Sequence, residues 1–298
     1  MDMTECFENF ILSRRLADLS PKTLSDYRQF IIPFVGFVGK ETPLSDLTQN
    51  NINAYIKVLL DKPLSKSTRV TYIRNIKIFL KWLQSEYTVA YDYRKIKVPK
   101  SAKKNVKIYT PDELENIFTH IHAESDWLTA RNKCIIALMY DSGLRQSEVC
   151  LLERSRISYS DNTMVVHGKG NKERTVPLGS LAKYFMQQYL SLCPYTSKMV
   201  FVNRRGAPLT CNAVKLLVSK LSSELPFEFS SHKLRHNFAT NYCIDQYEER
   251  GQVDIYRLMI LLGHEDIETT KRYLHHATEI VGAKNCISHL DKIYGGKN

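Results

Sequence analysis

The 298-residue sequence has no apolar run near the ~20 residues that a membrane-spanning helix needs. Its first ten residues, MDMTECFENF, lack the basic-then-apolar pattern of a secretion leader. It also has no internal repeat and no low-complexity tract. These absences argue against a membrane protein, an exported protein and a repeat protein, so we expect a cytoplasmic protein. The length suits two domains.

Metal and disulfide signatures are missing as well. The seven cysteines are scattered, with no CxxC pair and no Cys/His cluster at zinc-ligand spacing. Such an odd, dispersed set predicts free thiols in a reducing compartment. We therefore expect no metal site.

A phosphate-binding loop is also absent. The glycine-rich stretch GKGNKERT, residues 168–175, matches neither GxxxxGK[ST] nor GxGxxG. Its glycines lie between two expected strands, whereas a phosphate loop leads from a strand into a helix. The sequence therefore argues against a nucleotide-binding enzyme.

Acidic residues are too few to balance the basic ones, and the net charge is +11. Residues 1–108 hold 19 Lys and Arg against 10 Asp and Glu, while residues 109–298 hold 23 against 21. The excess therefore lies mostly in the first third of the chain. This predicts a polyanionic partner such as nucleic acid, with a merely solvated basic surface as the alternative.

The first hundred residues predict four helices, near residues 4–17, 19–39, 47–62 and 64–87. Ser20 and Pro21 have the residue types of a helix N-cap and first turn. In the fourth segment, apolar residues repeat at helical spacing while Arg74, Lys77 and Lys81 fall on the opposite side. One face of this helix should pack and the other should be positive.

A basic stretch follows, RKIKVPKSAKKNVK at residues 94–107, with seven basic residues and no acidic one. Pro99 and Ser101 break any helix, so we place an interdomain linker at 94–108. A plain flexible linker is one interpretation, and a segment that follows a nucleic-acid backbone is the other. The predicted DNA-binding residues are Arg74, Lys77, Lys81, Lys95, Lys97, Lys100, Lys103 and Lys104.

The remainder predicts helices around one small hairpin. Thr110 and Pro111 begin the first helix, and NTMVVHGKGNKERTVPLG alternates in polarity as a strand, a turn and a second strand. From about residue 180 onward the pattern is helical again.

Seven residues of this part have chemistry to offer, although each has an ordinary structural reading. Arg145 and Glu148 are a common helix pair, and Lys169 stands at a hairpin tip. His232 and Arg235 share a helical face, and His264 and Tyr273 each suit a packed core. His236, His275 and His276 are expected to be surface or packing residues.

Their order is more specific than any one of them. The residues stand in DSGLRQSE, GKGNKER, HKLRH, LLGH and TTKRY. In order and spacing the sequence resembles the tyrosine recombinase family, the phage-integrase and Xer-like site-specific DNA recombinases. The resemblance spans about residues 109–275, and the N-terminal part matches in its helical character.

The resemblance implies a mainly α fold with a small β-sheet. Residues 1–93 would form a helical, SAM-like core-binding domain. Residues 94–108 would be the linker, and residues 109–298 a mixed α+β catalytic domain. A tail from about 276 to 298 would contact a neighbouring protomer; a tail folded on its own domain is the alternative.

The same resemblance implies roles. Tyr273 would be the nucleophile that forms a 3′-phosphotyrosyl link, Arg145 and Arg235 would bind the phosphate, and His264 would help to fix it. His232 corresponds to the general base or hydrogen-bond partner, Lys169 to the general acid, and Glu148 would support Arg145. Neither ATP nor a metal would be needed.

The implied partner is double-stranded DNA with an inverted-repeat core site, bound by a homo-tetramer that exchanges strands through a four-way junction. An accessory DNA-bending protein is a further possible partner, and the bound protein would lie on the bacterial nucleoid. We expect this recombination to act on the DNA of a phage or another mobile element. Two alternatives stay open: a type IB topoisomerase-like nicking and resealing enzyme, and a DNA-binding protein without catalysis.

Overall fold

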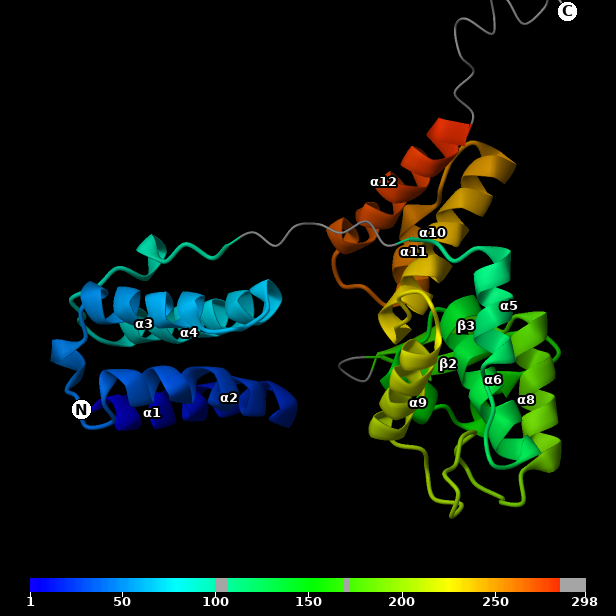
Figure 1. Cartoon of the computed structure of the whole chain (residues 1–298), viewed down its shortest axis with the longest axis horizontal. Coiled ribbons are helices and arrows are strands. Elements are labelled where there is room, and N and C mark those ends of the chain that lie inside the picture. The colour runs from blue at the N-terminus through cyan, green and yellow to red at the C-terminus, as the bar shows by residue number, and fades with distance from the viewer. Residues whose placement is uncertain (100–106, 169–171, 285–298) are drawn as a thin grey trace, which may run out of the picture. The chain divides into compact units, whose positions relative to one another are not determined.

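The computed structural model describes residues 1–99, 107–168 and 172–284. The chain divides into two compact units, Met1–Lys104 and Asn105–Asn298 (Figure 1). The division falls inside the segment predicted as the linker. Among the described residues, no helix is long and apolar enough to cross a membrane.

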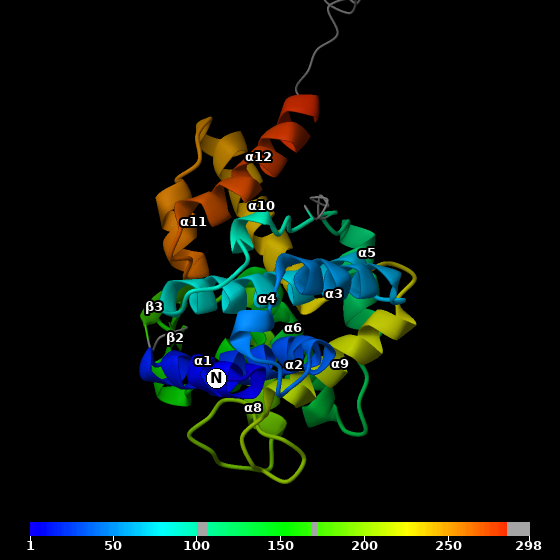
Figure 2. The ribbon, with the colours of Figure 1, turned by 90° about the vertical axis from the view of Figure 1, so that its left-hand side faces the viewer.

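The described part of the N-terminal unit, residues 1–99, is a bundle of four α-helices, as the sequence predicts (Figure 2). The helices are α1 (Met3–Leu16), α2 (Pro21–Val38), α3 (Gln49–Asp61) and α4 (Lys66–Glu86), with short 3-10 helices η1 (Leu44–Asp46) and η2 (Tyr93–Lys95). Each α-helix begins after a side chain that accepts from free backbone N–H groups. The capping residues are Asp2, Ser20, Thr48 and Ser65.

Aromatic side chains fill the core of this unit. The Phe10 ring lies 5.1 Å from that of Tyr27, 5.3 Å from Phe79 and 5.5 Å from Trp82, all in edge-on arrangements. These contacts join α1 to α2 and α4. The predicted apolar stripe of α4 is confirmed, since Ile73, Ile76, Leu80 and Leu83 are buried while Arg74 and Lys81 are exposed.

The linker predicted at 94–108 is packed at both ends. Ile96 is buried in the N-terminal core, and its carbonyl accepts from Lys77 Nζ at 2.8 Å. At the other end, the Lys107 carbonyl accepts from Asn237 Nδ2 at 3.4 Å. Ile96 and Val98 alternate with the cations and pack against the N-terminal core, so residues 94–98 are attached to the N-terminal unit.

The second unit contains eight α-helices and one three-stranded sheet in its described part (Figure 1). The helices are α5 (Pro111–Thr119), α6 (Asp126–Asp141), α7 (Gln146–Cys150), α8 (Ser180–Leu192), α9 (Cys211–Glu224), α10 (Ser231–Arg250), α11 (Ile255–Leu262) and α12 (Ile267–Lys284), and η3 spans Arg154–Arg156. The strands are β1 (Ile157–Ser158), β2 (Thr163–His167) and β3 (Glu173–Pro177). The predicted hairpin is confirmed: β2 pairs antiparallel with β3, and β1 with β2.

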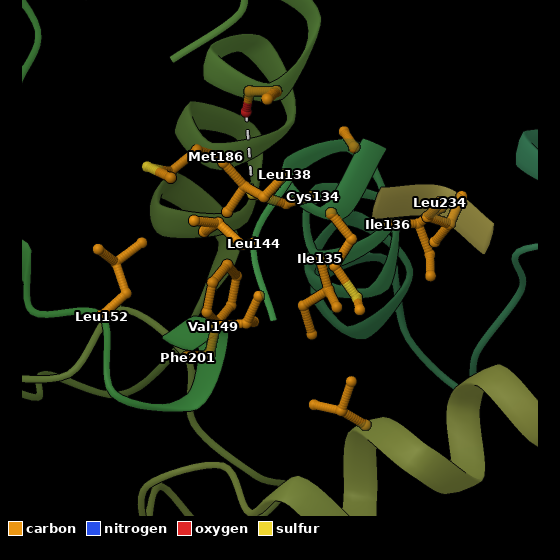
Figure 3. Close-up of a cluster of buried hydrophobic side chains, with 14 of the residues drawn as sticks. Cys134, Ile135, Ile136, Leu138, Leu144, Val149, Leu152, Met186, Phe201 and Leu234 are labelled. Carbon is orange, nitrogen blue, oxygen red and sulfur yellow. Dashed lines mark hydrogen bonds between the residues drawn. The ribbon is translucent and has the colours of Figure 1, made fainter. Parts of the chain in front are cut away.

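Two apolar clusters hold this unit together. The larger one centres on α6, and Figure 3 shows its residues Cys134, Ile135 and Leu138 beside Met186 of α8 and Phe201. The smaller one joins α10, α11 and α12 and includes Leu258, Leu262 and Tyr273. The predicted site residues of the described part lie in or beside α7, α10, α11 and α12, so the packing of these helices in the two clusters fixes their positions.

Candidate active site

Glu148 is a buried carboxylate held by two arginines. Arg145, the residue before α7, donates through Nη1 to Glu148 Oε1 at 2.8 Å, and its backbone N–H donates to Oε2 at 2.8 Å. Arg174 of β3 donates through Nη1 and Nη2 to the two carboxylate oxygens, both at 2.8 Å. Glu148 is 1% exposed. The predicted Arg145–Glu148 pair is thus part of a three-residue network that also includes Arg174.

The charge balance keeps Glu148 ionised. Burial alone would raise the pKa of this carboxyl group, but hydrogen bonds and charge from Arg174 and Arg145 outweigh it and lower the pKa to about 2. A carboxylate fixed in this way orients the guanidinium of Arg145, which remains about one-third exposed. Arg145 also donates through Nη2 to the Gly263 carbonyl at 3.2 Å.

Arg235 of α10 lies beside this network. Its Nη1 donates to the Gly143 carbonyl and its Nη2 to the Leu262 carbonyl, so the guanidinium is fixed between the start of α7 and the end of α11. Burial, followed by the charge of Arg145, lowers the pKa of Arg235 to about 10. Arg235 is therefore charged at neutral pH, and Arg145 is close enough to repel it. An anion bound to both guanidinium groups would relieve this repulsion.

His264 and Tyr273 face each other across the turn between α11 and α12. Their rings are stacked with centroids 6.2 Å apart, and His264 Nδ1 lies 2.8 Å from the hydroxyl of buried Thr270. Burial, with Arg235 and Arg145 nearby, lowers the pKa of His264 to about 4. The histidine is therefore neutral at pH 7.

Tyr273 is 6% exposed. Burial raises the pKa of its phenol, while the charges of Arg235, Arg272 and Arg145 favour the tyrosinate and oppose that rise. These are the cations that would stabilise negative charge on or near the phenolic oxygen. The phenol of Tyr273 therefore lies within the electrostatic reach of three arginines.

His232 and His236 are one turn apart on α10, with their Nε2 atoms 2.8 Å apart. The His236 ring also lies 5.0 Å from that of Tyr273. Desolvation, together with Arg235 and Arg272, lowers the pKa of His232. His236, expected to be a surface or packing residue, packs against Tyr273 and also contacts His232, so it touches two predicted site residues.

Arg145 links two hollows on the surface. One, of about 330 Å³, is lined by Arg145, His232 and Arg235, and the other by Arg145, Arg174 and His264. The structure thus gathers Arg145, Glu148, His232, Arg235, His264 and Tyr273 from four separate parts of the sequence. Lys169 lies outside the described residues. Among those described, no group of three or more His, Cys, Asp or Glu residues could hold a metal ion.

The predicted DNA-binding residues of the N-terminal unit divide into three groups. Arg74, Lys81, Lys95 and Lys97 are exposed. Lys77 differs, since its ammonium donates to the Ile96 carbonyl and lies 6.0 Å from the Tyr93 ring, which gives it a local structural role. Lys100, Lys103 and Lys104 lie outside the described residues.

Sequence reasoning missed three residues of the site: Arg174, His236 and Thr270. For Arg174 a signal was present, because it alternates with Val176 on the inward face of β3. His236 stands four residues after His232, a spacing that places both on one helix face. Thr270 gave no signal of this kind.

Two family models and several known proteins match this chain. The model of the phage integrase family matches residues 107–279, and that of the phage integrase SAM-like domain matches residues 2–109. Tyrosine recombinase XerC of Bacillus pumilus is 30% identical over 289 residues, covering 92% of this chain and 92% of the relative. Tyrosine recombinase XerD of Oceanobacillus iheyensis is 30% identical over 284 residues, covering 91% and 92%.

Solved structures share the fold. The XerH recombinase bound to a palindromic difH substrate, a post-cleavage complex, superposes with a TM-score of 0.70 at 21% identity over 88% of this chain and 78% of that one. The Tn1549 transposon integrase in complex with circular intermediate DNA gives 0.73 at 17% identity over 96% and 100%. The family model covers more than half of the sequence and the relatives nearly all of it, so the chain belongs to the phage integrase family, the tyrosine recombinases that act as site-specific DNA recombinases.

Proposed function

We propose that this protein cuts and rejoins DNA with Tyr273 as the nucleophile, through a 3′-phosphotyrosyl intermediate. The observation that carries the proposal is the position of Tyr273: it is buried, its ring lies against His264 and His236, and its pKa responds to Arg235 and Arg145. A tyrosine that served only as a core residue would have no need of these surroundings.

Arg145 and Arg235 would bind the non-bridging oxygens of the scissile phosphate. Each guanidinium has five N–H donors, and the contacts to Glu148, Gly263, Gly143 and Leu262 occupy only some of them. Charge gained by the five-coordinate transition state would therefore meet two oriented cations. This help is needed, because ionising an ordinary tyrosine in advance costs about 4 kcal/mol at pH 7.

The protons would be moved by the remaining groups. His232 would accept the phenolic proton or hydrogen-bond the phosphate, and neutral His264, held by Thr270, would contribute a further hydrogen bond to the phosphate. Lys169 remains the expected general acid for the departing 5′ oxygen. Because one phosphoester replaces another, the reaction would need no ATP, and the arginines would supply the charge that a metal ion supplies elsewhere.

Strand exchange would follow when a 5′ hydroxyl of a second duplex attacks the phosphotyrosine and forms a four-way junction. It requires a protein tetramer on paired inverted-repeat sites, with protomer contacts from the C-terminal tail, of which residues 285–298 lie outside the described part. The relatives that are 30% identical over nine-tenths of both chains are the tyrosine recombinases XerC and XerD, which favours resolution of DNA dimers over the phage or transposon role expected from the sequence. An accessory DNA-bending protein remains a possible partner of the assembled sites.

The two alternative functions would give different products. A topoisomerase-like enzyme would nick and reseal without joining two duplexes, so gel analysis of four-way junctions between two labelled sites separates it from a recombinase. A DNA-binding protein without catalysis would form no covalent product at all.

The first experiment is covalent capture. Wild-type protein, Tyr273→Phe and the matched control Tyr256→Phe, whose ring is 64% exposed on α11, are incubated with sheared source DNA, denatured in detergent, and the attached DNA is sequenced. We expect attachment with wild type and Tyr256→Phe but not with Tyr273→Phe, and enrichment of one sequence. Equal attachment by Tyr273→Phe would overturn the proposal.

A further inference from the structure

His232 and His236 form a hydrogen-bonded pair with one bridging position. Their Nε2 atoms are 2.8 Å apart and their rings are nearly perpendicular, at 84°, with centroids 4.2 Å apart. An imidazole nitrogen donates only when protonated and accepts only when bare. One hydrogen must therefore lie between the two nitrogens, donated by one ring and accepted by the other.

This rule couples the tautomers of the two neutral rings. If His232 donates from Nε2, its Nδ1 is bare and can accept a proton. If His236 donates, His232 accepts at Nε2 and carries its hydrogen on Nδ1, so Nδ1 can only donate. The direction of the 2.8 Å bond thus decides whether His232 can serve as a base at Nδ1.

The surroundings keep the pair neutral. Besides His232, the charged and titratable groups that act on His236 are Arg235 of α10 and Arg272 and His276 of α12. Burial and these groups lower the pKa of His236 to about 4. The centroid of the His236 ring lies 5.0 Å from that of the Tyr273 ring, which places His236 between His232 and the proposed nucleophile in the chain of contacts.

We propose that His236 is a positioning residue for DNA cleavage, one that accepts the Nε2–H of His232 and so keeps Nδ1 of His232 bare for the proton of Tyr273. This inference rests on the proposed function. In the forward step the O–H bond of Tyr273 breaks and its proton binds Nδ1 of His232, while the phenolic oxygen bonds to phosphorus. The bond from phosphorus to the 5′ oxygen breaks, and that oxygen takes a proton from the general acid.

Neutral His236 also stabilises the product of this transfer. Once protonated, His232 is an imidazolium that still donates from Nε2 to His236, and a charge-assisted hydrogen bond is stronger than a neutral one. Rejoining reverses the transfer and returns the proton to Tyr273.

Two variants separate this role from packing. His236→Phe keeps an aromatic ring against Tyr273 and His232 but has no nitrogen, whereas His236→Gln offers an amide oxygen that can accept from His232. Single-turnover cleavage is measured on a nicked duplex containing the sequence that covalent capture recovers. We expect the plateau rate of His236→Phe to fall by at least about tenfold. His236→Gln should recover part of that loss.

The pH profile gives a readout that a structural role would not move. Without the acceptor at Nε2, protonated His232 is less stable, so the acid limb of the His236→Phe profile should shift to lower pH. Wild-type rates and an unshifted limb in His236→Phe would overturn the inference while leaving Tyr273 as nucleophile. Absence of cleavage by the wild type would instead count against the proposed function.

Nuclear magnetic resonance tests the pair without DNA. In full-length protein labelled with ¹⁵N-histidine, and assigned with His232→Asn and His236→Phe, we expect His232 to carry its hydrogen on Nε2 and His236 to have a bare Nε2 at pH 7. A bare Nε2 on His232 would overturn the inference, whatever the enzyme's activity.

Discussion

At the scale of single residues, Arg174 bears most directly on how the site is built. It is 6% exposed, binds both oxygens of Glu148 and also donates from Nε to the Leu261 carbonyl at 2.8 Å. It therefore ties β3 to α7 and to the end of α11. Arg145 makes only one side-chain hydrogen bond to the same carboxylate, so Arg174 is the stronger anchor.

Removing Arg174 should cost stability. In Arg174→Met, Glu148 keeps one arginine but remains buried, and breaking a buried ion pair typically costs about 3–5 kcal/mol. We expect a loss near the lower end because Arg145 still pairs with Glu148. Urea unfolding measures the difference. The control is Arg156→Met, which breaks an exposed pair with Glu173 and should change stability by less than about 1 kcal/mol.

The same pair predicts a pH dependence. The pKa of Glu148 in the folded protein, about 2, lies below its ordinary value of 4.5, so its contribution is present above 4.5 and is lost as pH falls towards 2. In Arg174→Met the folded pKa rises towards the unfolded value, so the part of the stability that acid removes becomes smaller, and the stability of the variant should fall less steeply below pH 4.5 than that of the wild type. Unfolding midpoints between pH 7 and pH 2 test this, and coincident acid limbs for the two proteins would contradict it.

Much of the site follows from sequence because spacing along a helix fixes a shared face, as for His232 and Arg235. Spacing along the chain could not predict a residue that a distant segment adds to the same contact, as Arg174 does. Glu148 was assigned to Arg145 alone, since nothing local indicates that β3 brings a second guanidinium from 26 residues away. Thr270 was missed for the same reason, as a hydroxyl has many ordinary roles.

At the scale of elements, the end of α11 positions several donors and acceptors. Gly263 caps the helix with a left-handed backbone, φ 58°, and its carbonyl accepts from Arg145 Nη2. A Cβ built on Gly263 would lie 3.1 Å from Arg174 Nη1. Gly251, at the end of α10, has a similar φ of 69° but no atom within 4 Å of its Cβ position.

These two glycines form a matched test. Gly251→Ala and Gly263→Ala should each lose roughly 1 kcal/mol from the left-handed backbone alone. Gly263→Ala should lose more, because Arg174 must shift, and should also slow DNA cleavage by displacing the acceptor of Arg145. Calorimetry and single-turnover cleavage measure both effects. Equal stability and equal cleavage rates for the two variants would show that the contact with Arg174 does not matter.

Element boundaries were predictable where a side chain caps a helix, as Ser20 and Thr110 do. The packing of residues 94–98 on the N-terminal core was not predicted, because basic residues dominate this stretch and obscure its two apolar positions. Ile96 is buried while Lys95 and Lys97 stay exposed, so the stretch buries an apolar side chain without removing its cations from water.

At the scale of the whole molecule, the positive charge of the N-terminal unit predicts DNA affinity that falls with salt. Replacing Arg74, Lys81 and Lys97 together by Gln should reduce the slope of log K against log salt by about 3, if each contacts a phosphate. The control replaces Lys22, Lys40 and Lys62, exposed cations outside the predicted set, and changes the net charge equally. Fluorescence anisotropy between about 50 and 200 mM salt gives the slopes. Equal slopes for the two triple variants would show that DNA does not bind at Arg74, Lys81 and Lys97.

The central claim is that Tyr273 becomes covalently joined to DNA. The most direct measurement is mass spectrometry of the captured wild-type complex after nuclease and protease digestion. We predict a 3′-linked nucleotide phosphate on the peptide that contains Tyr273, and none on the peptide that contains Tyr256. A nucleotide on any other residue, or no adduct in a protein that binds the recovered site, would contradict the account.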